Sequence, residues 1–221
     1  ANTTASYNTA VGFQALKVST IAHSCTAVGY KALTTNGTGG TDGKYNTAVG
    51  YQAMKDNANG ESNTALGLSA LEANTSANYN TAVGRQALQA NTTGTTLTAL
   101  GAHALKANTT ADSNTALGYD AMLYNTTGAS NTAVGRQALT ANTTGASNTG
   151  IGMTTLAANT TGSYNTAVGS TSLDANTTGQ YNSALGRNSL TANTTGASNV
   201  AIGKSSLESN TTADNNTAVG V

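Results

Sequence analysis

Hydrophobic and polar residues alternate along the chain with a 17-residue period, far longer than the period of a helix or a strand. A period of this length indicates stacked structural repeats. The interval is constant throughout except between Cys25 and Asn46, where four residues are added. We place these additional residues near Gly40–Gly43, in an exposed turn. The units begin at Asn8, Cys25, Asn46, Asn63, Asn80, Leu97, Asn114, Asn131, Asn148, Asn165, Asn182, Asn199 and Asn216.

The consensus unit is Asn-Thr-Ala-Val-Gly-x-Gln-Ala-Leu-x-Ala-Asn-Thr-Thr-Gly-x-Tyr/Ser, and its residues are called the first to the seventeenth place. The fourth place is always aliphatic, from Val11 to Val219, and the ninth is always Leu or Met, from Leu16 to Leu207. Two large apolar residues cannot fill a core alone, but stacking in register makes each of them part of a continuous column. We therefore expect both columns to be buried, with alanine at the third and eighth places allowing the walls to approach closely.

The 17-residue unit is too short for a pair of helices, which needs about 33 residues. Two short strands fit instead, one around Thr-Ala-Val and one around Gln-Ala-Leu, with turns at the fifth-place glycine and at Asn-Thr-Thr-Gly. We predict an all-β protein, a parallel β-solenoid of about 13 coils with two short strands per coil, as one continuous array over residues 1–221. No divergent capping turn is present at either end, so we expect either that the array is a segment of a longer chain or that other subunits cover its ends. The corner glycines are Gly12, Gly29, Gly50, Gly67, Gly84, Gly101, Gly118, Gly135, Gly152, Gly169, Gly186, Gly203 and Gly220.

Stacked coils place identical residues above one another. The asparagines of the first place and those of the twelfth are therefore expected to form two amide ladders of the kind found in cross-β structures.

Composition limits the partners of the chain. Leu, Ile, Val and Phe together contribute about 14% of the chain, less than the roughly 20% that a globular domain usually exceeds. Nine basic residues balance nine acidic ones, whereas disorder is associated with high net charge. A low-complexity disordered linker stays an alternative. The balanced charge offers no basic surface for nucleic acid or for an anionic membrane, so we expect neither as a partner. No apolar run is long enough to span a bilayer.

Asn46 to Ala53, and its copies such as Asn131 to Ala138, resemble the head repeats of YadA-like trimeric autotransporter adhesins and similar repeats of phage tail-fibre proteins. The resemblance implies a left-handed parallel β-roll, association into a homotrimer, and a role in adhesion at a cell or virion surface. The unit of this chain is longer than the usual head repeat and has Asn-Thr-Thr-Gly in its second turn. We expect a structural segment of an extracellular fibre or adhesin head, a rigid rod that self-associates and contacts a surface glycan or host receptor.

Catalytic and metal-binding patterns are missing from the sequence. His23 and His103 occupy different places about five coils apart, and the nine carboxylates recur at no fixed place, so they form no cluster for acid–base chemistry. Calcium-binding β-rolls need an aspartate in every coil. We expect no enzymatic activity, no cofactor and no metal.

Some side chains have a structural and a functional interpretation. Cys25 replaces a first-place asparagine, as a tolerated substitution or as a reactive or interchain thiol. The cationic residues of the sixth place are an anion-binding stripe or ordinary solvated side chains. The tyrosines of the seventeenth place are a carbohydrate platform or rings that stack on the surface beside the corner. The stripe would comprise Arg85, Arg136, Arg187 and Lys204, and the platform Tyr7, Tyr45, Tyr79, Tyr164 and Tyr181.

The turn sequence Asn-Thr-Thr also leaves two pairs of alternatives. It is good turn chemistry, and it is also an N-glycosylation acceptor that would sheath the rod with sugar. The threonine column that includes Thr92, Thr109, Thr126 and Thr143 raises ice binding as an alternative function. The candidate glycosylation sites at the twelfth place are Asn2, Asn36, Asn74, Asn91, Asn108, Asn125, Asn142, Asn159, Asn176, Asn193 and Asn210, and one more acceptor triplet begins at Asn215.

Overall fold

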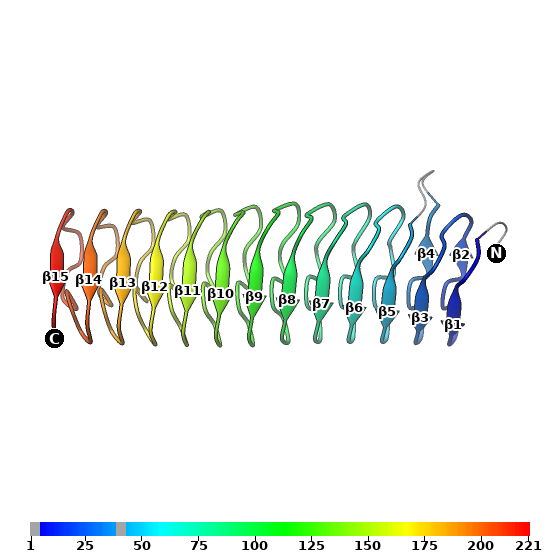
Figure 1. Ribbon diagram of the computed structural model, residues 1–221, viewed down its shortest axis with the longest axis horizontal. Coiled ribbons are helices and arrows are strands. Elements are labelled where there is room, and N and C mark those ends of the chain that lie inside the picture. Colours follow the sequence, from blue (N-terminus) through cyan, green and yellow to red (C-terminus); the bar gives the residue numbers. More distant parts are fainter. Residues whose placement is uncertain (1–4, 39–42) are drawn as a thin grey trace. The chain divides into compact units, whose positions relative to one another are not determined.

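The computed structural model describes residues 5–38 and 43–221, and every regular element in them is a short β-strand. The chain divides into two compact parts, residues 1–113 and 114–221, which are called the first and the second unit from here on, while each 17-residue repeat is called a coil. The first unit contains β1 (Thr9–Val11), β2 (Val18–Ser19), β3 (Thr26–Val28), β4 (Thr35–Asn36), β5 (Thr47–Val49), β6 (Thr64–Leu66), β7 (Thr81–Val83) and β8 (Thr98–Leu100). The second contains β9 (Thr115–Leu117), β10 (Thr132–Val134), β11 (Thr149–Ile151), β12 (Thr166–Val168), β13 (Ser183–Leu185), β14 (Val200–Ile202) and β15 (Thr217–Val219). In Figure 1 a strand arrow recurs in successive coils, and β2 and β4 are drawn as additional strands next to β1 and β3.

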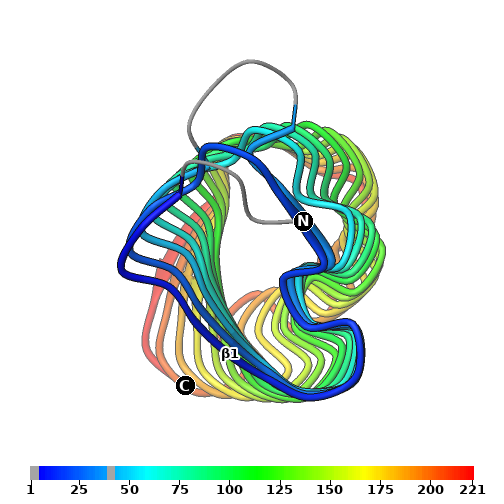
Figure 2. The same cartoon turned by 90° about the vertical axis from the view of Figure 1, so that its right-hand side faces the viewer.

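Strands of successive coils pair in parallel within each unit, and each residue lies opposite its counterpart one coil later. Thr64 lies opposite Thr81 in β6 and β7, and β3 and β5 keep the same register across the insertion, with Thr26 opposite Thr47. Figure 2 shows the closed outline of the coils. The predicted parallel β-solenoid with a 17-residue repeat is confirmed.

The prediction of a second strand around Gln-Ala-Leu is wrong. This segment forms turns in the described coils, and the only strands outside the Thr-Ala-Val segment are β2 and β4, at the eleventh and twelfth places. The seventh and ninth places have positive φ, for example 57° at Gln86 and 52° at Leu88, so the backbone bends at every second residue. Its N–H groups still bond to neighbouring coils, because Gln86 N donates to Leu68 O (2.8 Å) and Leu88 N to Ala104 O (3.0 Å). The ladder between coils therefore continues without an extended strand.

The core is a narrow column of small and medium side chains. Ala82, Ala87 and Leu88, at the third, eighth and ninth places, are completely buried, as are their counterparts in most coils. A side-chain carbon added at Gly150, the one glycine at the third place, would lie 3.5 Å from the Leu139 side chain. Third-place and ninth-place residues thus pack against each other across the coil. The predicted burial of the ninth-place column is confirmed.

The fourth-place aliphatic residues are not buried, contrary to the sequence prediction. Leu66, Leu100 and Leu185 are 46%, 49% and 51% exposed. Side chains in a strand alternate between the two faces. Because the third-place alanine points inward, the second-place threonine and the fourth-place aliphatic residue both point outward. The invariant aliphatic column therefore lies on the surface.

Glycine at the fifth place forms a sharp corner, as predicted. At Gly152, φ is 137°, and a Cβ there would lie 2.7 Å from the carbonyl group of Gly169 in the next coil. This backbone region is essentially restricted to glycine, and the coils also approach too closely for a side chain.

The inserted residues lie one position earlier than predicted. Gly43 O accepts hydrogen bonds from Cys25 Sγ (3.3 Å) and Asn36 Nδ2 (3.0 Å), the first-place and twelfth-place residues of its coil. Gly60 O accepts from the corresponding Asn46 and Asn57 one coil later. Gly43 is therefore a regular fifteenth-place residue. The additional residues are 39–42, and the predicted positions 40–42 lie outside the described residues.

Candidate functional site

A ladder of buried asparagines at the first place follows the inner corner of the coils. Asn148 Oδ1 accepts the backbone N–H of Asn165 at 3.0 Å and its Nδ2 at 3.2 Å. Asn165 Oδ1 repeats the same pair of bonds with Asn182. Each amide thus bonds to the next coil, which confirms the predicted ladder.

A second ladder is formed by the twelfth-place asparagines. Asn159 Nδ2 donates to Asn142 Oδ1 at 2.8 Å and to Gly162 O at 3.0 Å. Gly162 O also accepts Asn148 Nδ2 from the first ladder at 2.8 Å. The fifteenth-place carbonyl therefore joins the two ladders. A buried polar network is stabilising where its groups are satisfied by hydrogen bonds. In the second ladder Asn74 Oδ1 is an exception, because it is buried and has no hydrogen-bond partner among the described residues.

Cys25 takes the place of an asparagine within the first ladder. Its side chain is 1% exposed, and Sγ donates toward Gly43 O (3.3 Å) and His23 O (3.4 Å). Sγ also accepts from Asn36 Nδ2 at 3.4 Å. Burial raises the pKa of the Cys25 thiol, which disfavours the reactive thiolate. The structure thus favours a tolerated substitution over a reactive or interchain thiol.

The candidate glycosylation sites are the twelfth-place asparagines of the second ladder. Nine of them have completely buried side chains, whereas Asn210 is half-buried and Asn2 lies outside the described residues. The Nδ2 atom of Asn176, which would carry the sugar, donates to Asn159 Oδ1 (2.8 Å) and Gly179 O (3.1 Å). Burial of the acceptor nitrogen favours the turn interpretation. The nine buried sites are Asn36, Asn74, Asn91, Asn108, Asn125, Asn142, Asn159, Asn176 and Asn193.

We therefore expect the nine buried sites to carry no sugar in the folded protein, even after secretion from a eukaryotic host. Any mass above the 21.8 kDa of the bare chain should then come from Asn2, Asn210 or the exposed acceptor triplet at Asn215. A glycan on Asn176 would have to open the ladder, so any glycosylated fraction should lack the folded β spectrum. Intact-mass spectrometry of folded protein purified from such a host tests this expectation. Sugar on Asn176 in the folded fraction would contradict it.

The threonine column at the thirteenth place is half-buried, and its hydroxyl groups are used within the fold. Thr92 Oγ1 donates to Thr109 O, and Thr143 Oγ1 donates to Thr160 O, each at 3.0 Å. A hydroxyl hydrogen committed to a carbonyl cannot also donate to an ordered water layer. This observation reduces the support for ice binding through that column.

The remaining predicted candidates are dispersed on the surface. His23 accepts a hydrogen bond from Ser6 N at 3.0 Å, while His103 lies in a seventh-place turn. The described residues contain no group of three His, Cys, Asp or Glu side chains that could hold a metal ion. They also contain no helix long and apolar enough to span a bilayer. The four residues of the predicted cationic stripe are exposed, Arg85 in the first unit and Arg136, Arg187 and Lys204 in the second.

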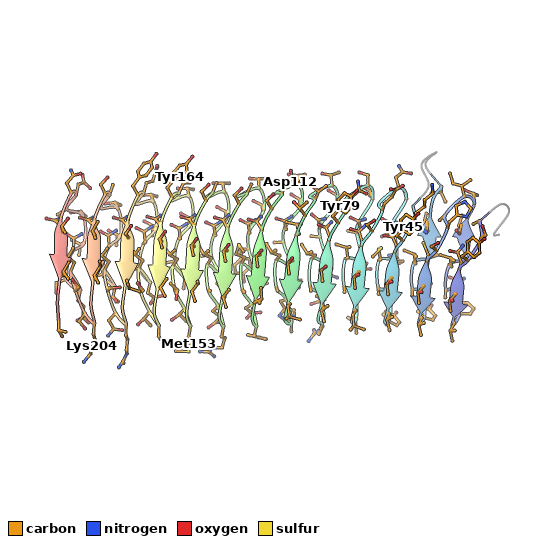
Figure 3. All side chains as sticks on the ribbon, viewed as in Figure 1. Tyr45, Tyr79, Asp112, Met153, Tyr164 and Lys204 are labelled. Carbon is orange, nitrogen blue, oxygen red and sulfur yellow. The ribbon has the colours of Figure 1, made fainter. Side chains whose placement is uncertain are left out.

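Tyrosines of the seventeenth place are exposed, among them Tyr7, Tyr45 and Tyr79. Tyr164 and Tyr181 stack with ring centroids 5.0 Å apart. Figure 3 labels several of these tyrosines.

A second aromatic stack, of Phe13, Tyr30 and Tyr51, was not predicted from the sequence. Its ring centroids are 5.4 and 5.1 Å apart. The signal was an aromatic residue at the sixth place in three consecutive coils.

The outer sheet face is the most continuous surface feature. We use this name for the outward side chains at the second and fourth places of each coil. The second place is almost always threonine, and the fourth is always Val, Leu or Ile. Every fourth-place side chain is half-buried or exposed. Exposed apolar residues also occur at the sixth place, namely Phe13, Tyr30, Tyr51 and Leu68 in the first unit and Tyr119 and Met153 in the second.

A polar pocket lies in the first unit, at a corner away from the strands. It has a volume of about 330 Å³ and is lined by Asn59, Glu61, Ser76 and Asn78, from the fourteenth and sixteenth places of two consecutive coils. No sequence pattern had indicated this group.

Neither a protein-family model nor a curated protein nor a solved structure matches this chain.

Proposed function

We propose that the chain is a structural repeat segment of an extracellular fibre or adhesin head, and that it self-associates through the outer sheet face. The observation that carries the proposal is the outward-facing aliphatic side chain at the fourth place of every coil, which is half-buried or exposed. Isolated exposed apolar residues are ordinary, but a contiguous apolar surface usually marks an interaction site.

A second copy of this chain is the occupant that best fits this face. The aliphatic column repeats with the coil, so a partner with the same coil spacing meets it in register along its length. The face also carries no charged residue at its second or fourth place, which removes the cost of burying unpaired charge. Following the resemblance to trimeric adhesin heads, we propose a left-handed roll assembled as a homotrimer.

The proposed assembly also answers the shortage of large apolar residues. Most interior positions other than the ninth place are alanine, asparagine or serine, so one coil buries little apolar area. Burial of the outer sheet face against partners adds about 25 cal/mol per Å². The segment would then act as a spacer or head at a cell or virion surface.

Substitution of two fourth-place residues tests the interface. Leu66→Asp together with Leu100→Asp should convert the assembly into monomers, because carboxylates would be buried against apolar partners. We expect the dissociation constant of the assembly to rise at least about 100-fold, as measured by sedimentation equilibrium. Thr93→Asp, at an exposed fourteenth-place position, is the control and should leave the assembly intact. A wild-type chain that is folded and monomeric at high concentration would refute the proposed self-association.

A further inference from the structure

The polar pocket is lined by Asn59, Glu61, Ser76 and Asn78, and two of these residues differ from the consensus threonine at the fourteenth place. Every coil from Thr93 to Thr212 has threonine at the fourteenth place, whereas the two pocket coils have asparagine and serine. The sixteenth place carries glutamate and asparagine in the same two coils. The solenoid continues through both coils in unchanged register, because β5, β6 and β7 pair like their neighbours. The fold therefore does not require these four side chains.

One side chain of the pocket has an unsatisfied hydrogen-bonding atom. Asn59 Oδ1 is buried and has no hydrogen-bond partner among the described residues. An unsatisfied buried acceptor costs about 1–3 kcal/mol, so it favours a donor from outside the chain. Rotation of the Asn59 amide would direct this oxygen toward a group bound in the pocket.

The sixteenth-place residues supply a fixed arrangement of polar groups. Asn78 Oδ1 accepts the backbone N–H of Glu61 at 2.7 Å. This bond fixes the orientation of the Asn78 amide and directs its Nδ2 donors away from the Glu61 backbone. The Glu61 carboxylate offers two acceptor oxygens, and the Ser76 hydroxyl both donates and accepts. The pocket thus mixes acceptors with a few donors and carries a single formal charge.

The residue after Asn78 in the chain is aromatic. Tyr79 directly follows Asn78 and is 65% exposed, and its backbone N–H donates to Glu61 O at 3.1 Å. This hydrogen bond holds the Tyr79 backbone beside that of Glu61, and Figure 3 labels the Tyr79 side chain. An exposed phenol ring offers an apolar face together with a polar hydroxyl.

We propose that this pocket binds one neutral sugar residue of a surface glycan, with Tyr79 stacking against its apolar face. A pair of neighbouring sugar hydroxyls donates to the Glu61 carboxylate, and a third donates to Asn59 Oδ1. Ser76 Oγ and Asn78 Nδ2 donate to sugar oxygens. The volume of about 330 Å³ lies at the small end of ligand pockets, which suits one residue. The Glu61 charge disfavours acidic sugars. This proposal rests on the proposed adhesive function, because it names the partner that such a segment would contact.

The proposal is tested by nuclear magnetic resonance titration of the full chain with methyl glycosides of galactose, mannose and N-acetylglucosamine. We expect at least one glycoside to shift the amide signals of residues 59–61 and 76–79, with a dissociation constant of about 1 mM. Glu61→Gln should weaken this binding at least about tenfold, because it replaces a charged acceptor, and Tyr79→Ala should weaken it severalfold. Asp112→Asn changes a carboxylate at the same place of another coil, where Asp112 Oδ1 accepts Thr95 N, and should leave the affinity unchanged.

Three results would overturn the sugar proposal. One is the absence of shifts at these residues with all three glycosides at 50 times the expected dissociation constant. Another is equal binding by wild-type protein and Glu61→Gln. The third is a shift of the same signals by calcium chloride alone together with no response to sugar, which would identify a cation site. Sedimentation equilibrium on the same samples reports self-association separately, so failure of sugar binding and failure of the proposed assembly are distinguishable.

Discussion

Gly152→Ala is expected to lower the free energy of unfolding by about 4 kcal/mol, whereas Gly150→Ala, two residues earlier, should raise it by about 0.5 kcal/mol. At Gly152, φ is 137°, and a Cβ would lie 2.7 Å from the backbone of Gly169 and 2.7 Å from Thr155 Oγ1. The methyl group would therefore combine backbone strain with a clash that a side-chain rotation cannot relieve. At Gly150 the nearest atoms lie 3.5 Å away, an ordinary packing distance, and the other coils carry alanine there.

Urea denaturation followed by circular dichroism measures both variants under the same conditions. Because the two substitutions add the same atom within one strand and its corner, their difference isolates the corner geometry from any general effect of added bulk. Equal effects for the two variants would contradict the assigned role of the fifth-place glycine.

Asn165→Asp is expected to lower the free energy of unfolding by about 3 kcal/mol at pH 7. The Asn165 side chain is completely buried, and its Nδ2 donates to Gly179 O at 2.8 Å and to Asn148 Oδ1 at 3.2 Å. A carboxylate in its place would face both oxygens without a proton to donate. It would also be a buried charge without a cationic partner.

The loss should be smaller at pH 4 than at pH 7. Burial and the facing oxygens raise the pKa of the introduced carboxyl group in the folded state above its unfolded value of about 3.9. A raised folded-state pKa means that the favourable protonated form is retained at low pH and lost as the pH rises through that pKa. Protonation restores one hydrogen-bond donor, and stability relative to wild type therefore increases as the pH falls.

Thermal and urea denaturation at both pH values check this dependence. Asn215→Asp is the control, because Asn215 is exposed and its substitution should change stability by less than about 0.5 kcal/mol at either pH. A loss for Asn165→Asp that stays constant between pH 4 and pH 7 would contradict a buried, titrating ladder position.

The repeat length, the parallel stacking and the corner glycines could be predicted from the sequence, because each depends only on periodicity. The amide ladders could be predicted for the same reason, since stacking places Asn148, Asn165 and Asn182 above one another whatever the shape of the coil.

The direction of each side chain could not be predicted in the same way. Alternation along a strand assigns Ala82 and Val83 to opposite faces, but the sequence does not say which face is inside. The larger residue is normally the buried one, and here the alanine is buried because the ninth-place Leu71 and Leu88 already fill the interior. The seventh-place and ninth-place residues also adopt positive φ, which nothing in Gln-Ala-Leu indicates. The pocket at Glu61 could not be predicted from the consensus, because its residues occur in only two coils and do not recur with the repeat.

The strict 17-residue register has a consequence for how such a chain can change in length. Removal of residues 131–147 would bring the coil that begins at Asn148 into the position of the coil that begins at Asn131, and the first-place asparagine, third-place small residue and fifth-place glycine would again meet their own kind. Duplication of the same segment would extend the stack equally well. Gain or loss of whole repeats by recombination between them therefore alters the number of coils while leaving every interior contact of the same type, so length can be selected independently of the fold.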